Sequence, residues 1–263
     1  MIGLGSYAFF WHHWAENPDR IDLHEALRRT RAAGVDLFQI CDYAPLAQMS
    51  DDELDAVRAT ADDLGLTLEV GTKGVDPQHL QRFLHIAGRL DAGLVRSMLF
   101  APESRPSLAE AEQWLRAALP AFEASGVDLA LETYEQVAVD DLVALVETIG
   151  SDRLGICLDP ANAVAALENR RTVVERTAPY VKNIHVKDFA FTRRGGWVGF
   201  TLEGAPLGTG LLDYDHLIRT VRPQERGINQ IVEHWLPLGD DLESTLRTED
   251  DWNTHNLQYL RSK

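Results

Sequence analysis

The sequence has few cysteines, a deficit of basic residues and no long hydrophobic run. Only Cys41 and Cys157 occur, each inside an apolar segment, so a disulfide framework is excluded and reduced thiols in the cytoplasm are expected. The net charge of −16 disfavours nucleic acid and anionic membranes as partners. The first residues lack the basic region of a secretion signal, and charge interrupts them too early for a membrane span. We therefore expect a cytoplasmic protein with no nucleic-acid or membrane partner.

Linkers and low-complexity tracts are also missing, and a length of 263 residues suits one domain. Short apolar segments instead alternate with helical patterns eight times along the chain. The predicted strands are residues 2–6, 35–41, 66–70, 94–100, 127–132, 154–159, 181–186 and 228–233. The predicted helices are residues 21–33, 51–64, one from 76–77 onward, 107–125, 140–149, 163–177, 214–221 and 242–260.

Capping residues mark several of these helices. Ser50 and Glu53 form the pattern of a capping box before the second helix, and Gly65 follows its last residue. Ser107 and Glu110 repeat the pattern further along the chain. These signals fix where the helices begin and end.

The alternation predicts the fold class. Strands that are continuously apolar and alternate with helices indicate a parallel sheet covered by helices on its faces. Eight such units in this length predict an α/β protein, a (β/α)8 TIM barrel that forms a single domain over residues 1–263. The alternative is an open doubly wound sheet. That fold would need a glycine-rich phosphate turn, and neither GxGxxG nor GxxxxGK[ST] follows a strand here.

One connection, at about residues 189–212, is too long for an ordinary barrel loop. It contains GGWVGF and GAPLGTG, and it carries Arg193, Arg194, Trp197 and Phe200. Long loops in compact domains are usually functional or disordered. We expect a lid-like insertion over the site, and the alternative is a passive surface hairpin.

The last four predicted strands each end in a side chain that can bind a metal ion. These side chains are Glu132, Asp159, His185 and Glu233. The carboxyl ends of barrel strands meet in one mouth, so we expect the four groups to form one site. Three carboxylates and one imidazole favour Mn²⁺, with Mg²⁺ or Co²⁺ as alternatives, over a structural zinc. The competing interpretation is four unrelated strand ends, each with its own salt bridge.

The motifs LALETYE, GICLDPAN, NIHVKD and QIVEHW resemble the xylose-isomerase-like family of sugar isomerases and epimerases over essentially the whole chain. The resemblance implies that Glu132, Asp159, His185 and Glu233 bind one divalent metal ion. It also implies that Glu132 and Glu233 are the catalytic acid and base of an enediolate reaction, and that the chain forms a homodimer or a homotetramer. Asn162, in DPAN, departs from the family pattern, which often has His there.

Several further residues are predicted to contact the substrate. Lys187 shares a strand face with His185, although a salt bridge to Asp188 or another acid explains it equally well. The other candidates are Asn162, Lys73 after the third strand, Arg96 in the fourth, Arg193 and Trp197 in the insertion, and His12 in an aromatic cluster.

Several functions remain open at this stage. The first is a metal-dependent isomerase or epimerase that acts on a sugar or sugar acid. The second is a lyase, either a dehydratase or a decarboxylase, because HVKDFAFTRRGGWVGFTLEGAPLGTG resembles a branch associated with decarboxylation of a 3-oxo-isoapionate-type acid. A nuclease similar to endonuclease IV should be richer in His and more basic. A non-catalytic binding barrel would not require two opposed glutamates.

Overall fold

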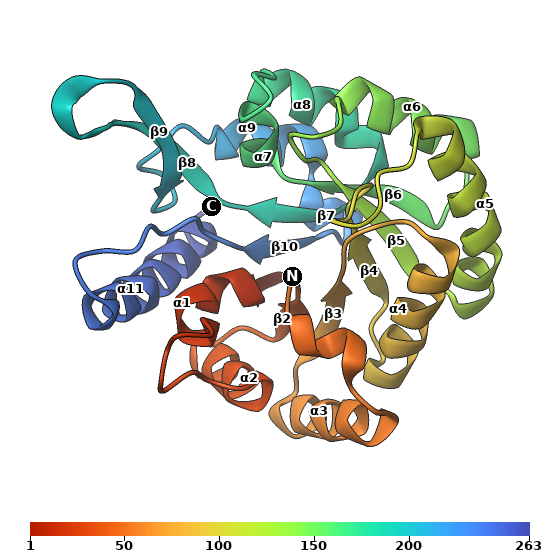
Figure 1. Cartoon of the computed structure of the whole chain (residues 1–263), viewed down its shortest axis with the longest axis horizontal. Helices are drawn as coiled ribbons and strands as arrows, with labels where there is room; N and C mark the ends of the chain where they lie inside the picture. The colour runs from red at the N-terminus through yellow and green to blue at the C-terminus, as the bar shows by residue number, and fades with distance from the viewer.

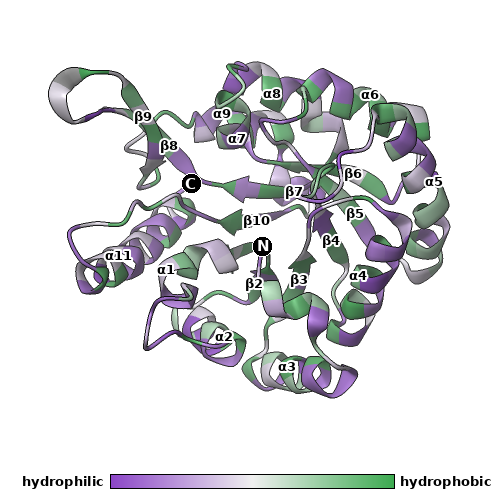
Figure 2. Cartoon of the chain, viewed as in Figure 1, coloured by the Kyte–Doolittle hydropathy of each residue, from purple (hydrophilic) through white to green (hydrophobic). Residues whose placement is uncertain are grey.

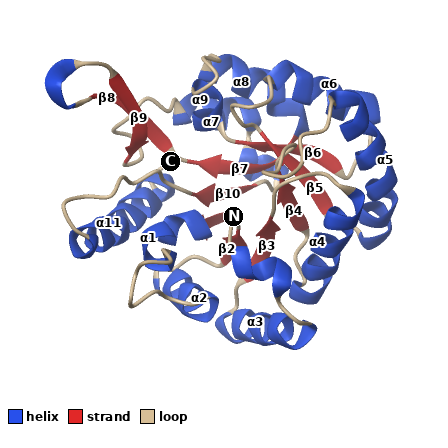
Figure 3. Cartoon of the chain, in the orientation of Figure 1, coloured by secondary structure: helices blue, strands red, loops and turns tan.

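A closed barrel of eight parallel strands forms the centre of the computed structural model, which describes residues 1–263 apart from the side chain of Trp197. The strand order around the barrel is β1-β10-β7-β6-β5-β4-β3-β2 (Figure 3). The strands are β1 (Ile2–Gly5), β2 (Leu37–Ile40), β3 (Thr67–Gly71), β4 (Leu94–Ser97), β5 (Asp128–Glu132), β6 (Leu154–Leu158), β7 (Val181–Val186) and β10 (Asn229–Val232). The predicted TIM barrel is therefore confirmed.

Helices surround the barrel, and their apolar sides pack on the strands (Figures 1 and 2). The helices of this layer are α2 (Leu23–Ala32), α3 (Asp51–Leu64), α4 (Pro77–Leu90), α5 (Leu108–Ser125), α6 (Val139–Ile149), α8 (Arg170–Thr177), α9 (Tyr214–Val221) and α11 (Leu242–Arg261). Among the described residues, none of the helices combines the length and apolar character that a membrane crossing requires.

The capping signals appear in the structure where the sequence predicts them. The Ser50 and Glu53 side chains each bond the other residue's backbone N–H at the start of α3, and Ser107 with Glu110 does the same for α5. Gly65 ends α3 with a φ of 66°. Because that left-handed backbone strains residues that have a Cβ, glycine is the residue that ends the helix cleanly.

The predicted helix over residues 163–177 is wrong in its extent. The structure has α7 (Pro160–Val164) and α8, separated by a segment in which Leu167 has a φ of 62°. The Asn169 side chain accepts a hydrogen bond from Arg171 N at 3.0 Å and begins α8 afresh. Six short helical segments were not predicted, because a single turn has no periodicity: η1 (Ser6–Phe9), α1 (Phe10–His13), η2 (Ala44–Gln48), η3 (Ala178–Tyr180), η4 (Gly195–Trp197) and α10 (Pro223–Arg226).

The long connection after β7 is an antiparallel hairpin. Its strands are β8 (Asp188–Arg193) and β9 (Phe200–Ala205), joined through η4 (Gly195–Trp197), and it projects from the barrel (Figure 1). The buried Asp188 carboxylate holds the returning chain by accepting hydrogen bonds from Gly208 N at 3.0 Å and Gly210 N at 2.9 Å. The base of the hairpin is therefore fixed, and a lid function for its outer part remains a prediction.

Candidate active site

A cavity of about 360 Å³ opens at the carboxyl ends of the strands. Glu132 and Glu233 line it from the second half of the chain, and Lys73 and Arg96 line it from the first half. Burial of so many charged groups is costly unless they are paired with one another or with a bound ion. The pairing of each group therefore indicates what the site is built to bind.

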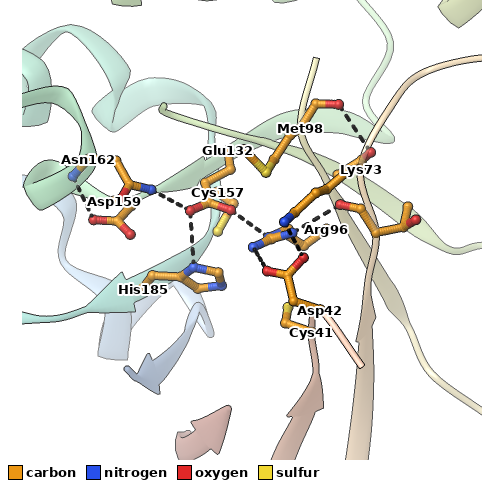
Figure 4. A network of polar contacts seen from close by, with 12 residues as sticks. Cys41, Asp42, Lys73, Arg96, Met98, Glu132, Cys157, Asp159, Asn162 and His185 are labelled. Carbon is orange, nitrogen blue, oxygen red and sulfur yellow. Dashed lines mark hydrogen bonds and ion pairs between the residues drawn. The ribbon is translucent and has the colours of Figure 1, made fainter. Parts of the chain in front are cut away.

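Glu132, the last residue of β5, lies at the centre of the polar network in Figure 4. Its Oε2 is 2.5 Å from Arg96 Nε, and its Oε1 accepts a hydrogen bond from Asn162 Nδ2 at 2.6 Å. Burial alone would raise the pKa of Glu132. The Arg96 guanidinium, and after it His185, instead hold that pKa well below its usual range. Glu132 is therefore ionised throughout the physiological pH range.

Asp159 directly follows β6 and is completely buried. Its Oδ1 accepts hydrogen bonds from the backbone N–H groups of Ala161 at 3.0 Å and Asn162 at 3.2 Å, so it caps α7. Its Oδ2 is 2.7 Å from Lys187 Nζ. Burial raises the pKa of Asp159 to about 6, although Lys187 opposes that rise.

His185 and Glu233 complete the set that the sequence predicts. His185 Nδ1 is 3.5 Å from Glu132 Oε1 and 3.4 Å from Glu233 Oε2. Glu233 Oε2 also lies 2.9 Å from Lys187 Nζ, which therefore bridges Glu233 and Asp159. Lys187 is buried, and burial alone would lower its pKa, but Asp159 and then Glu233 raise that pKa well above its usual value. Lys187 is thus a fixed cation inside the site.

The pKa of His185 is also raised well above its usual value. Burial alone would lower it, while Cys157, Glu233 and Glu132 raise it. Burial raises the pKa of Cys157 to about 12, so the thiol is neutral at physiological pH and the two carboxylates are the physical source of the effect. Without a metal ion, the imidazole therefore retains a proton that a cation must displace.

The donor set satisfies a test for a divalent metal ion. Single ligand atoms of Glu132, Asp159 and His185 all lie within 4.8 Å of one another, and those of Cys41, His185 and Glu233 do so as well. Two of the four predicted ligands, His185 Nδ1 and Glu233 Oε1, have a buried atom with no hydrogen-bond partner among the described residues. Glu132 Oε2 and Asp159 Oδ2 are instead paired with the cations Arg96 and Lys187. Unpartnered atoms are costly to bury, and coordination to a cation would satisfy His185 Nδ1 and Glu233 Oε1, with carboxylate oxygens of Glu132 and Asp159 nearby as further ligands.

The other side of the mouth carries positive charge from the first half of the chain. Asp42 Oδ1 is 2.9 Å from Lys73 Nζ, and Asp42 Oδ2 is 3.3 Å from Arg96 Nη2. Arg96 Nη1 also donates to Thr72 O at 3.0 Å. Lys73 is partly exposed at the mouth, whereas Arg96 is buried. These cations could bind an anionic group of a ligand.

Four of the residues predicted to contact substrate line this cavity: Asn162, Lys187, Lys73 and Arg96. Two others lie elsewhere. His12 is buried, with its Nδ1 2.6 Å from Glu249 Oε2, so it ties α1 to α11. The Arg193 guanidinium lies over the Phe200 ring on the hairpin, 4.6 Å from the ring centroid. Among the side chains that the structure describes, Leu202 of the hairpin lines the cavity. The side chain of Trp197 lies outside the described residues.

Several residues that line the cavity were missed in the sequence, and three of them, Tyr7, Asp42 and Trp235, contact its cations. The Lys187 ammonium lies 4.7 Å from the centroid of the Trp235 ring and 5.8 Å from that of Tyr7. Asp42, the third, directly follows the segment predicted as the second strand. The strand-end rule that selected Glu233 also places Trp235, two residues later, near the mouth. Applied to the first two strands, it would have found Tyr7 and Asp42.

The fold and the site define a TIM-barrel protein with a cluster of carboxylates and a histidine at the carboxyl ends of its strands. The comparisons with known proteins give its family. The model of the xylose isomerase-like TIM barrel family matches residues 27–263, and the chain belongs to this family. A 3-oxo-isoapionate decarboxylase from Pectobacterium atrosepticum is 50% identical over 262 residues, which cover 100% of this chain and 95% of that protein. The family and this relative make the chain an enzyme of the isomerase, epimerase or lyase kind.

Solved structures of other proteins share the fold. A D-psicose 3-epimerase crystallised with D-fructose gives a TM-score of 0.75 at 16% identity, covering 99% of this chain and 98% of that chain. A xylose isomerase-like TIM barrel protein from Mycobacterium smegmatis, in complex with magnesium, gives a TM-score of 0.72 at 18% identity, covering 97% and 96%. At these identities the likeness establishes the barrel architecture and no particular substrate.

Proposed function

We propose that the chain is a divalent-metal-dependent decarboxylase that acts on a 3-oxo sugar acid of the 3-oxo-isoapionate type. The full-length relative with 50% identity supports this reaction. The structural observation that carries the proposal is the composition of one cavity, in which Glu132 and Glu233 of the candidate metal site lie together with Lys73, Arg96 and Lys187. A 3-oxo acid needs a metal ion and basic side chains together. Its carbonyl oxygen gains negative charge, which the metal ion would stabilise, and its carboxylate must be bound by cations.

The metal ion would be held by Glu132, Asp159, His185 and Glu233, with Mn²⁺ the first candidate and Mg²⁺ or Co²⁺ the alternatives. When bound, such an ion polarises the ketone and stabilises the charge that develops on its oxygen. Loss of CO₂ breaks the bond between the carboxyl carbon and the adjacent carbon. The electron pair of that bond forms an enolate, which must then take up one proton at carbon.

The two glutamates have different parts in that proton transfer. Glu132 is held ionised beside Arg96, so it is a base and a poor proton donor near neutral pH. Glu233 has one oxygen on Lys187 and the other without a hydrogen bond. We assign delivery of the proton at carbon to Glu233, which Lys187 holds in place, and electrostatic stabilisation to the pair of Glu132 and Arg96.

A sugar isomerase or epimerase is the second candidate. The observation that favours it is the position of Glu132 and Glu233, both of which approach His185 Nδ1, at 3.5 and 3.4 Å. Two carboxylates around one metal position could remove a proton from one face of a carbon and return it on the other. Both reactions pass through an enolate, so their products separate them better than the structure of the site does.

The proposal is tested by incubating the enzyme with 3-oxo-isoapionate and Mn²⁺ in D₂O. We expect release of CO₂ and one deuteron in the product, measured by mass spectrometry. Deuterium uptake without loss of CO₂ would favour the epimerase. Neither change with Mn²⁺, Mg²⁺ or Co²⁺ would contradict the proposal.

The remaining expectations concern the partner, the cellular compartment, the oligomeric state and the hairpin. We propose a small-molecule sugar acid as the partner, action in the cytoplasm, and a homodimer or homotetramer, which light scattering would resolve. Buried free thiols at Cys41 and Cys157 are compatible with a reducing compartment. The hairpin β8–β9 is proposed as a lid of the single domain, since Leu202 already reaches the cavity.

A further inference from the structure

A layer of polar side chains lies inside the barrel beside the candidate metal site. Barrel interiors are usually filled by branched apolar residues. Here Gln39 of β2, Glu69 of β3 and Asn183 of β7 are buried together. The Glu69 carboxylate accepts hydrogen bonds from Gln39 Nε2 at 2.9 Å, Asn183 Nδ2 at 2.9 Å and Asn229 Nδ2 at 2.7 Å. A buried network of this cost suggests a purpose beyond packing.

The network fixes which way the Gln39 amide points. Its NH₂ group donates to Glu69 Oε2 and, at 3.1 Å, to Asn183 Oδ1. Asn183 is itself oriented by its own NH₂ donation to Glu69. A flipped Gln39 would set its carbonyl oxygen against two acceptor oxygens, which is repulsive. Gln39 Oε1 must therefore face the opposite way.

On that opposite side, Gln39 Oε1 lies 2.7 Å from His185 Nε2 and 2.8 Å from the Cys41 thiol. An amide oxygen only accepts hydrogen bonds, so His185 Nε2 must carry a hydrogen. In the neutral ring, Nδ1 then has the lone pair, and Nδ1 is the atom that approaches Glu132 and Glu233. A histidine that binds a metal ion needs this arrangement, with one nitrogen donating to the protein and the other open.

We propose that Gln39 and Glu69 are positioning residues for the metal centre. Gln39 sets the tautomer and ring orientation of His185, and Glu69 acts one step further away by setting the orientation of Gln39. This inference rests on the proposed function, because it concerns the same metal site. It adds two residues that do not line the cavity and whose effect reaches the cation through hydrogen bonds alone.

The test is the affinity for Mn²⁺, measured by calorimetry with MnCl₂ and no substrate. Gln39→Leu should weaken binding by about 10- to 100-fold, the usual effect of losing a hydrogen bond to a metal ligand. Glu69→Leu, which removes the acceptor that orients Gln39, should weaken binding by no more than that. The double variant should bind no more weakly than Gln39→Leu alone, because Glu69 acts only through Gln39. Tyr214→Phe is the matched control. It removes another buried hydrogen bond, to Gln230 at 2.7 Å, and should leave the affinity within about twofold of wild type.

Two outcomes would overturn the inference while leaving the metal site intact. One is wild-type affinity in both single variants, and the other is a double variant in which the two losses multiply. Failure of the wild-type protein to bind any of the candidate cations would instead contradict the proposed function, and this inference with it.

A second measurement needs no variant that might fail to fold. In the Mg²⁺-loaded wild-type protein, ¹⁵N-histidine NMR should find the His185 proton on Nε2. A proton on Nδ1 would overturn the inference.

Discussion

The two halves of the chain bring opposite chemistry to the mouth of the barrel. In the second half, acids and an imidazole lie at or near the ends of β5, β6, β7 and β10, and His185 Nδ1 and Glu233 Oε1 among them have no hydrogen bond. In the first half, Lys73 and Arg96 are already paired with Asp42. The second half therefore has more carboxylates than its own cation, Lys187, can neutralise, while the first half presents cations whose charge is only partly neutralised.

This difference shows how one fold can hold a ligand that binds a metal ion through some of its oxygens and basic side chains through others. A 3-oxo acid has oxygens that bind a metal ion at one end and a carboxylate at the other. Arg96 links the halves, because its guanidinium contacts both Asp42 and Glu132. The predictions below separate what each half contributes.

The largest effect on activity is expected in the second half. Glu233→Gln should lower kcat by about 10²- to 10⁴-fold, because it removes the group assigned to proton transfer. Steady-state CO₂ release measures this change. Glu147→Gln is a suitable control, since Glu147 lies on the outer helix α6 and pairs with Tyr180 at 2.6 Å. Equal kcat for Glu233→Gln and the wild type would contradict the assignment.

Arg96→Met tests the link between the halves. It should lower the free energy of unfolding of the metal-free protein by about 3–5 kcal/mol, because buried Glu132 would lose its countercharge. Urea denaturation measures the loss. Arg116→Met removes an exposed i,i+4 pair with Glu112 and should cost at most about 1 kcal/mol. A similar loss of stability in both variants would show that the buried Arg96–Glu132 pair stabilises the fold no more than an exposed pair does.

The affinity for Mn²⁺ should rise with pH. The pKa of Asp159 is raised by burial to about 6, and the pKa of His185 is raised as well, so both hold protons that a cation must displace. Affinity should increase about tenfold per pH unit above pH 6, where only His185 releases a proton, and more steeply below it. Calorimetry between pH 5 and 8 checks this. An affinity that is constant with pH would contradict it.

The same raised pKa values act in the opposite direction on the metal-free fold. The folded protein binds protons at Asp159 and His185 more tightly than the unfolded chain does. Their contribution to stability is therefore present at low pH and lost as pH rises through each folded pKa.

Lys73→Met tests the first half at its most exposed position. Loss of a charged contact to the substrate carboxylate should raise KM by about tenfold, with a smaller change in kcat. The Lys73–Asp42 pair is partly exposed, so the stability should change by less than about 1 kcal/mol. A fall in kcat at constant KM would instead assign Lys73 to the chemical step.

The smallest effect is expected at the hairpin. The Arg193 guanidinium lies over Phe200 and outside the cavity lining, so Arg193→Ala should leave kcat/KM within about twofold of wild type. A loss of more than about tenfold would show that the hairpin closes over the substrate and brings this residue to it.

Much of the fold could be predicted, because the local signals agree with the global structure. Continuous apolar strands, the Ser50 capping box and the glycine after α3 all point to the same alternation of elements. The break between α7 and α8 was missed because its causes are local. Residues 163–177 have a helical composition, but the Asn169 cap and the left-handed Leu167 end one helix and begin another.

The candidate metal site was predictable for a topological reason, since strand ends of a barrel converge whatever the loops do. His12 and Arg193 lie on connecting segments, and their direction depends on contacts that no periodicity encodes. The polar layer was hidden for another reason. Gln39 and Glu69 interrupt apolar strands as register partners on the neighbouring strands β2 and β3, and only the closed barrel brings Asn183 and Asn229 to them.

The central claim is that four strand-end side chains hold a single divalent cation. An electron paramagnetic resonance titration of the protein with Mn²⁺ tests it directly. We predict one bound ion per chain in the wild-type protein, and loss of that ion in Asp159→Asn. Absence of saturable binding, or unchanged binding in Asp159→Asn, would contradict the account.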